Sequence, residues 1–185
     1  KSCIYKLNSS DKDEQIPISQ ADAKYKRYIG NGAPKHFLSW SNNLTWRNFD
    51  LSVFFRGTFG FDVFNMRKYG MGLQGCGTDN VLRSAYLEDK NIRTGGGVIS
   101  SYFLEDGSFI KLENVTLGYN FTPKNRKLLD NMRIYLSAKN LFTLTGYSGN
   151  DPSIIDVNGI QPGVDSNSAY PTATQLSLGV TLRFK

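Results

Sequence analysis

The stretch QLSLGVTLRF, residues 175–184, decides the fold. Its large apolar residues occupy every second position: Leu176, Leu178, Val180, Leu182 and Phe184. The residues between them are polar, small or charged, so a strand here has one apolar and one polar face. With a rise of about 3.3 Å per residue and a tilt near 40°, nine residues climb roughly 20–25 Å, the height of the apolar band of a transmembrane β-barrel. The stretch is therefore interpreted as the last strand of such a barrel.

Four segments upstream show the same period of two, and each is predicted to form a strand. They are residues 38–46, 49–61, 114–121 and 132–143. The pattern has blemishes, because Asn42 and Asn140 fall on the apolar side. Lys111 and Glu113 also take the apolar parity upstream of the third segment, so its hydrophobic band is predicted to be short. We expect an all-β chain of five antiparallel strands.

The connections between these segments alternate strictly between short and long. Residues 47–48 and 122–130 form short turns, whereas residues 62–106 and 146–174 are long and rich in Gly, Asn, Asp and Ser. Outer-membrane barrels have short periplasmic turns and longer extracellular loops. With a periplasmic carboxy terminus, both long connections and residues 1–35 are predicted to be extracellular, and residues 36–184 to carry the strands.

Two sets of side chains follow from this orientation. Aromatic residues next to the short turns and at the end of the last strand are predicted to form a girdle at one membrane interface, where amphipathic rings are favoured: Trp46, Phe49, Tyr119, Phe121 and Phe184. By parity, a second set points into the barrel, where it contacts a plug or lines a translocation path: Arg56, Arg133, Tyr135, Lys139 and Arg183.

Alternation alone also fits a soluble β-sandwich, in which the two faces are core and solvent. An adhesion or carbohydrate-binding module of that kind is the alternative interpretation. The long and short connections and the one-sided aromatic residues favour the barrel. A helical membrane protein is excluded, because no window approaches the roughly 18 consecutive apolar residues that a spanning helix requires.

At these same residues the sequence resembles the SusC/RagA-type TonB-dependent outer-membrane transporters of Bacteroidetes. The resemblance covers roughly residues 27–184, and four stretches carry it: IGNGAPKHFLSWSNNLTWRNFDLSVFFRGTFGFDVFN, DGSFIKLENVTLGYNF, RIYLSAKNLFTLTGYSGNDPSI and YPTATQLSLGVTLRF. It implies a fragment of a barrel of about 22 strands. It also implies that the amino-terminal plug domain is absent from this chain, and that the strand from Leu176 to Phe184 resembles the signal recognised by the barrel-assembly machinery.

The resemblance implies a function as well. Such transporters lie in the bacterial outer membrane as multi-pass proteins and import nutrients too large for porins, here an oligosaccharide or oligopeptide. The expected partners are TonB, through the missing amino-terminal part, a SusD-like surface lipoprotein, the barrel-assembly machinery, the substrate and the lipid bilayer.

Other classes of function find little support in the sequence. The lone histidine, His36, has no cysteine or serine partner motif, so an enzyme is not expected. The net charge of +6 is spread along the chain without a basic run, which argues against nucleic-acid binding.

Three smaller features of the sequence concern a metal site, a disulfide and a helix. Oxygen-bearing side chains at Asn150, Asp151, Asp156, Asn158 and Asp165 suggest a calcium loop, but their spacing is not that of an EF-hand, so we expect an ordinary polar loop and no cofactor. Cys3 and Cys76 are compatible with one disulfide or with two free thiols. Apolar residues around 80–89 predict a short amphipathic helix.

Overall fold

The computed structural model of the chain describes residues 3–7, 13–17, 28–72, 80–83, 99, 101–123, 129–153, 162–166, 170 and 172–184. It divides into two compact units. The first comprises residues 1–32, 62–105 and 155–169, and the second comprises residues 33–61, 106–154 and 170–185. Cys76, Asp156 and Asn158 lie outside the described residues, as does the side chain of Cys3.

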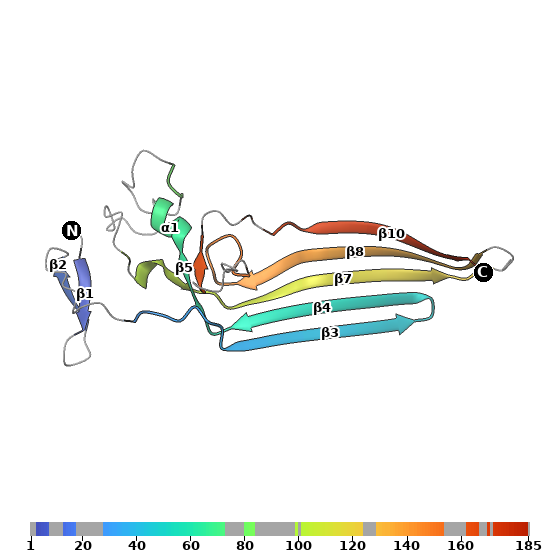
Figure 1. The fold of residues 1–185 in the computed structure, drawn as a ribbon, viewed down its shortest axis with the longest axis horizontal. Coiled ribbons are helices and arrows are strands. Elements are labelled where there is room, and N and C mark those ends of the chain that lie inside the picture. The colour runs from blue at the N-terminus through green and yellow to red at the C-terminus, as the bar shows by residue number, and fades with distance from the viewer. Residues whose placement is uncertain are drawn as a thin grey trace. The chain divides into compact units, whose positions relative to one another are not determined.

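The second unit is built on one five-stranded antiparallel sheet (Figure 1). Its strands are β3 (His36–Trp46), β4 (Phe49–Phe59), β7 (Phe109–Phe121), β8 (Leu129–Thr145) and β10 (Gln175–Phe184). They lie in the order β10-β8-β7-β4-β3, so strands that follow one another along this unit are neighbours. The five predicted strands and their antiparallel meander are therefore confirmed.

The strand ends show why the short and long connections alternate. The β3–β4 turn, the ends of β7 and β8 that face each other, and the end of β10 all lie at one end of the sheet (Figure 1). Arg47 in the two-residue turn has a φ of 55°, a left-handed conformation that tight hairpins require. At the opposite end β4 stops at Phe59, two residues earlier than predicted, because Gly60 turns the chain with a φ of 73°.

One face of the sheet is apolar and exposed. Its middle row is a set of five leucines paired across all five strands: Leu44, Leu51, Leu117, Leu136 and Leu178. Leu178 is 75% exposed and Leu136 is 51% exposed. Contiguous exposed apolar surface of this kind marks contact with another apolar partner. In a chain with this alternation, the partner that fits is the hydrocarbon of a bilayer.

A β-bulge corrects the sequence analysis of β7. Phe54 of β4 pairs with Asn114 but Phe55 pairs with Leu112, so Glu113 is an extra residue. The bulge moves Lys111 to the polar face and returns Ile110 and Leu112 to the apolar face. The predicted short apolar band was therefore wrong, because strict parity was carried across an inserted residue.

The neighbouring strand β8 is irregular at the same level. The pairing of β7 with β8 passes from Asn114 opposite Lys139 to Leu112 opposite Phe142. Asn140, the blemish in the predicted pattern, has a φ of 52°, a conformation that asparagine tolerates better than most residues. Its side-chain amide donates to the carbonyl oxygen of Ala173 at 3.3 Å, and its own carbonyl accepts from the hydroxyl of Thr174 at 2.9 Å. The irregularity thus joins β8 to the segment that leads into β10.

The first unit contains short elements. They are β1 (Cys3–Leu7), β2 (Asp13–Pro17), β5 (Asp62–Asn65), α1 (Met66–Met71), the 3₁₀ turn η3 (Ser101–Phe103), β6 (Leu104–Asp106) and β9 (Val164–Asp165). β1 pairs with β2, and β5 lies between β6 and β9. The rings of Phe64, Tyr69 and Phe103 form a cluster with centroids 5.2–6.1 Å apart. The long connection predicted at 62–106 therefore contains regular structure of its own.

The helix in this connection differs from the predicted one. Residues 80–83 carry no helix, so the beginning of the helix predicted over 80–89 is wrong, and residues 84–89 lie outside the described residues. The helix is α1, which begins after Asn65, whose side-chain oxygen accepts from the backbone N–H of Lys68 at 2.8 Å. Asparagine is a strong N-cap, and this was the available sequence signal. Among the described residues, none of the helices is long and apolar enough to cross a membrane.

Candidate functional site

The candidate site is the polar face of the five-stranded sheet, where the residues predicted to point inward lie. Near the short-turn end, Arg133 of β8 makes a two-point contact with Asp50 of β4: its Nε donates to Oδ1 at 3.1 Å and its Nη2 to Oδ2 at 2.5 Å. The side-chain amide of Asn120 adds a third hydrogen bond to Oδ1 at 2.8 Å. Such fork-to-fork pairing is the strong form of a charge-assisted hydrogen bond.

Glycines make these cross-strand contacts possible. Asp50, Gly118, Tyr135 and Gly179 follow one another in register from β4 to β10. A Cβ on Gly118 would lie 2.5 Å from Oδ1 of Asp50 and 2.8 Å from Nε of Arg133, so the ion pair bridges β7 only because residue 118 has no side chain. A Cβ on Gly179 would likewise lie 2.3 Å from the ring of Tyr135. Large side chains lie flat over glycines along this row.

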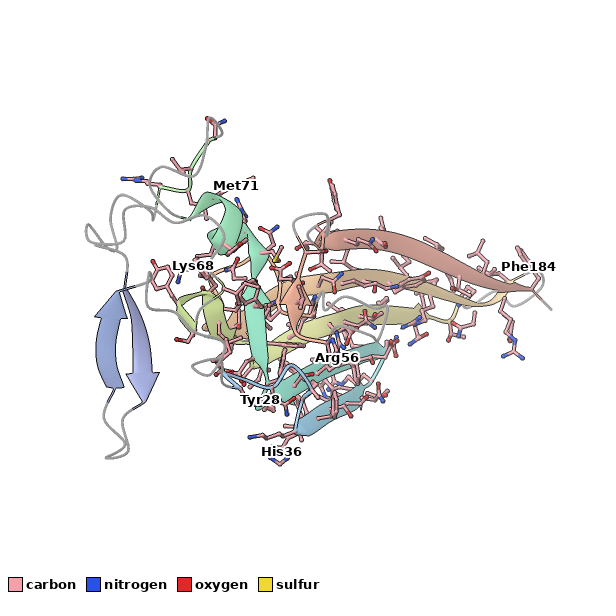
Figure 2. The ribbon with its side chains drawn as sticks, turned by 60° about the vertical axis from the view of Figure 1, so that its left-hand side comes forward. Tyr28, His36, Arg56, Lys68, Met71 and Phe184 are labelled. Atoms are coloured by element: carbon pink, nitrogen blue, oxygen red, sulfur yellow. The ribbon has the colours of Figure 1, made fainter. Side chains whose placement is uncertain are left out.

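The remaining inward residues lie farther apart. Arg56 Nε is 3.0 Å from Glu113 Oε2, but the N–H is not aimed at the oxygen, so the contact is ionic and not a hydrogen bond. The guanidinium also lies over the ring of Phe109, 5.7 Å from its centroid. Figure 2 labels Arg56 on the sheet and Phe184 at its far end. Arg183 is exposed and reaches Asp130 only at 3.9 Å, while Lys139 is in register with Asn114 and Gln175.

The aromatic girdle residues all lie on the apolar face or at its short-turn end. Trp46 pairs with Phe49, and Phe49 pairs with Tyr119, with ring centroids 4.8 Å apart. Phe121 pairs with Met132, and Phe184 pairs with Leu129. Three of the five rings thus form one row across β3, β4 and β7. Their role at a membrane interface stays a prediction, as does the role of the β10 strand in barrel assembly.

Sequence reasoning missed the most buried polar cluster of this face. The Lys111 side chain is 3% exposed and that of Asp151 is 4% exposed, and Nζ lies 2.9 Å from Oδ2. The ammonium also donates to the hydroxyls of Ser153 at 3.1 Å and Thr172 at 3.3 Å. The second carboxylate oxygen of Asp151 accepts from the backbone N–H of Ser153 at 2.8 Å and from its hydroxyl at 2.6 Å. The usable signal was Lys111 itself, since a lysine on an apolar parity indicates a bulge.

The surroundings of Asp151 set its charge. Burial alone raises the pKa of this carboxyl group, but hydrogen bonds from Ser153, Thr172 and Lys111 outweigh burial and hold the pKa below its ordinary value of 3.8. Asp151 is therefore an anion at neutral pH, with a lysine ammonium as its counter-ion. In the part of the chain that the structure describes, no group of three or more His, Cys, Asp or Glu side chains is placed to hold a metal ion.

The comparisons with known proteins agree with this geometry. TonB-dependent receptor P3 of Formosa agariphila is 28% identical over an alignment of 196 residues, which covers 95% of this chain and 18% of the relative. TonB-dependent receptor SusC of Bacteroides thetaiotaomicron is 28% identical over 153 residues, covering 78% of this chain and 14% of the relative. No family model matches the chain. The chain spans less than a fifth of the length of these curated relatives.

Solved structures have the same fold. The RagAB peptide importer in its open-open state superposes with a TM-score of 0.73 at 23% identity, over 97% of this chain and 20% of the other. Its closed-closed state gives 0.72 at 22% identity, over 96% of this chain and 20% of the other. The fold is thus that of antiparallel strands in a TonB-dependent barrel. The resemblance to SusC/RagA-type TonB-dependent transporters is confirmed.

The Gly118 contact yields a stability prediction. Gly118→Ala places a methyl group against Asp50 and Arg133, so we expect it to lower the free energy of unfolding by about 1–3 kcal/mol through overpacking. The midpoint of denaturant unfolding in detergent measures this loss. Gly146→Ala is the matched control, because nothing lies within 4 Å of a Cβ there. Equal midpoints for the two variants would contradict the prediction.

The pKa of Asp151 yields a pH prediction. A carboxyl group with a depressed pKa stabilises the fold fully above its ordinary pKa of 3.8, and this contribution is lost as the pH falls through the lower folded value. The difference in unfolding free energy between the native protein and the double variant Lys111→Met with Asp151→Asn, which leaves no unpaired buried lysine, should therefore stay constant from about pH 8 to about pH 5 and shrink only below about pH 4. A difference that already declines above pH 5 would show that Asp151 is not held ionised.

Proposed function

We propose that this protein is a TonB-dependent outer-membrane transporter that imports nutrients too large to pass through porins. The observation that carries the proposal is the two-faced meander: one face is an exposed apolar surface and the other is polar and crossed by ion pairs. In a barrel, the first face meets lipid and the second faces the interior. Similarity to TonB-dependent receptors over 95% of the chain supports the same function.

The proposed orientation places the short-turn end in the periplasm. Residues 1–35, 62–106 and 146–174 are then extracellular, where they meet substrate and a SusD-like surface lipoprotein. TonB is contacted by a plug region that lies in the part of the relatives not spanned by this chain. The β10 strand, ending at Phe184, is proposed as the element that the barrel-assembly machinery recognises.

The proposed substrate is an oligopeptide or an oligosaccharide. One set of similar structures is described as a peptide importer, which supports the first class. The resemblance to SusC-type transporters leaves an oligosaccharide as the other candidate substrate. The two are separated by growth of a gene-deletion strain on each class of nutrient as sole source.

An uptake measurement tests transport itself. Cells that express the full-length protein should take up a labelled oligopeptide or oligosaccharide mixture, and deletion of the gene should abolish uptake of one of the two. Collapse of the inner-membrane proton gradient with an uncoupler should stop that uptake, because TonB draws on this gradient. Uptake that persists without the gradient would contradict TonB dependence, and recovery of the protein from the soluble fraction would favour the sandwich alternative.

Cysteine labelling tests the proposed orientation. In a full-length variant in which every native cysteine, Cys3 and Cys76 included, is replaced by serine, Tyr170→Cys should react with a membrane-impermeant maleimide on intact cells, because Tyr170 is 85% exposed in the connection proposed to be extracellular. Arg47→Cys, in the short β3–β4 turn, should react only after the outer membrane is permeabilised. The reverse pattern would invert the topology, and labelling of both on intact cells would argue against a membrane-spanning sheet.

A further inference from the structure

Lys111 gathers three distant segments of the chain around one ammonium group. It belongs to β7, whereas Asp151 and Ser153 follow β8 and Thr172 precedes β10, so the contacts link residues 40, 42 and 61 positions apart. A lysine ammonium has three N–H donors, and the three acceptors here use all of them. Both ends of the connection from β8 to β10 are thereby fixed to the polar face of β7.

The first end of this connection is packed as well as tethered. Tyr147 is 6% exposed, and its backbone N–H donates to the hydroxyl of Thr145 at 3.1 Å. Its ring lies where a Cβ on Gly149 would be, at 2.2 Å, and Pro152 is buried. Residues 146–153 therefore form an ordered layer over the sheet. The buried ion pair between Asp151 of this layer and Lys111 of β7 joins the layer to the sheet.

We propose that Lys111 is a positioning residue that clamps residues 146–153 over the polar face and makes them a fixed part of the passage wall. That these residues line a passage rests on the proposed function, whereas the clamp itself does not. A buried ion pair that has lost one partner leaves an uncompensated charge, which the structure relieves by admitting water. In Lys111→Met, separation of residues 146–153 from the sheet lets water reach the carboxylate of Asp151, so this separation should become more frequent.

Removal of the charges of both Lys111 and Asp151 distinguishes the clamp from simple packing. In the double variant Lys111→Met with Asp151→Asn, no charge remains buried; the asparagine oxygen still accepts from Ser153, and its amide nitrogen, in place of Oδ2, can donate to the hydroxyl oxygen of Thr172. Replacement of a buried ion pair by neutral groups of similar size is often tolerated. We therefore expect the double variant to restore the position of residues 146–153 that the single variant loses.

Hydrogen–deuterium exchange of the purified full-length protein in detergent tests the clamp. In the native protein, the peptide spanning 146–153 should exchange slowly. In Lys111→Met the same peptide should exchange about 100-fold faster, in keeping with the loss of a buried partner. Peptides from the middle of β8, such as 132–138, should be unchanged and report that the sheet stays intact. The double variant should return exchange of 146–153 to within about tenfold of the native rate.

Lys139→Met is the matched control, because it removes a lysine from the same polar face outside the clamp. The proposal is overturned if Lys111→Met leaves exchange of 146–153 at the native rate, if Lys139→Met accelerates it equally, or if the double variant exchanges as fast as the single one. The readout does not involve substrate, so it is separate from the uptake assay. Loss of the clamp with intact uptake, or the reverse, tells the two proposals apart.

Discussion

The antiparallel register of the five strands is the constraint on which the rest of this structure depends. Because side chains alternate strictly, one register places five leucines in a single row on one face and Asp50, Tyr135 and the two row glycines on the other. A slip by one residue would bury charges in lipid and leave leucines inside. Backbone groups in a bilayer have no water to bind, so the ladder between strands also satisfies their hydrogen bonds.

Much of this fold could be predicted from residues alone. The period of two located every strand of the sheet, and Arg47-Asn48 located the tight turn, because both signals are local. Lys111 on the apolar parity signalled an irregularity, but the β-bulge could not be located at Glu113 in this way, since an inserted residue is defined only by its partner strand. Because of the bulge, parity assigned Lys111 to the wrong face of the sheet. Its buried ion pair with Asp151, 40 residues away in the sequence, was therefore not predicted. Helix α1 was missed because six residues are too few to show helical periodicity.

Three cations of the polar face are compensated by neighbouring carboxylates. Arg133 is held by Asp50, Lys111 by Asp151, and Arg56 lies beside Glu113. Parity could identify Arg56 and Arg133 as inward residues, but it could not identify their partners, which come from neighbouring strands or from a long connection. These three cations therefore contribute little net field, whereas Lys139 is in register with the neutral residues Asn114 and Gln175.

The glycine at position 118 has a consequence for how this sequence can vary. The space that a side chain at position 118 would fill is occupied by a salt bridge that joins the strands on either side. Residues 50, 118 and 133 therefore form one steric unit. A mutation that enlarges residue 118 would push the carboxylate of Asp50 and the guanidinium of Arg133 out of their present contact. Related sequences that keep the Asp50–Arg133 pair are therefore expected to keep a glycine at position 118.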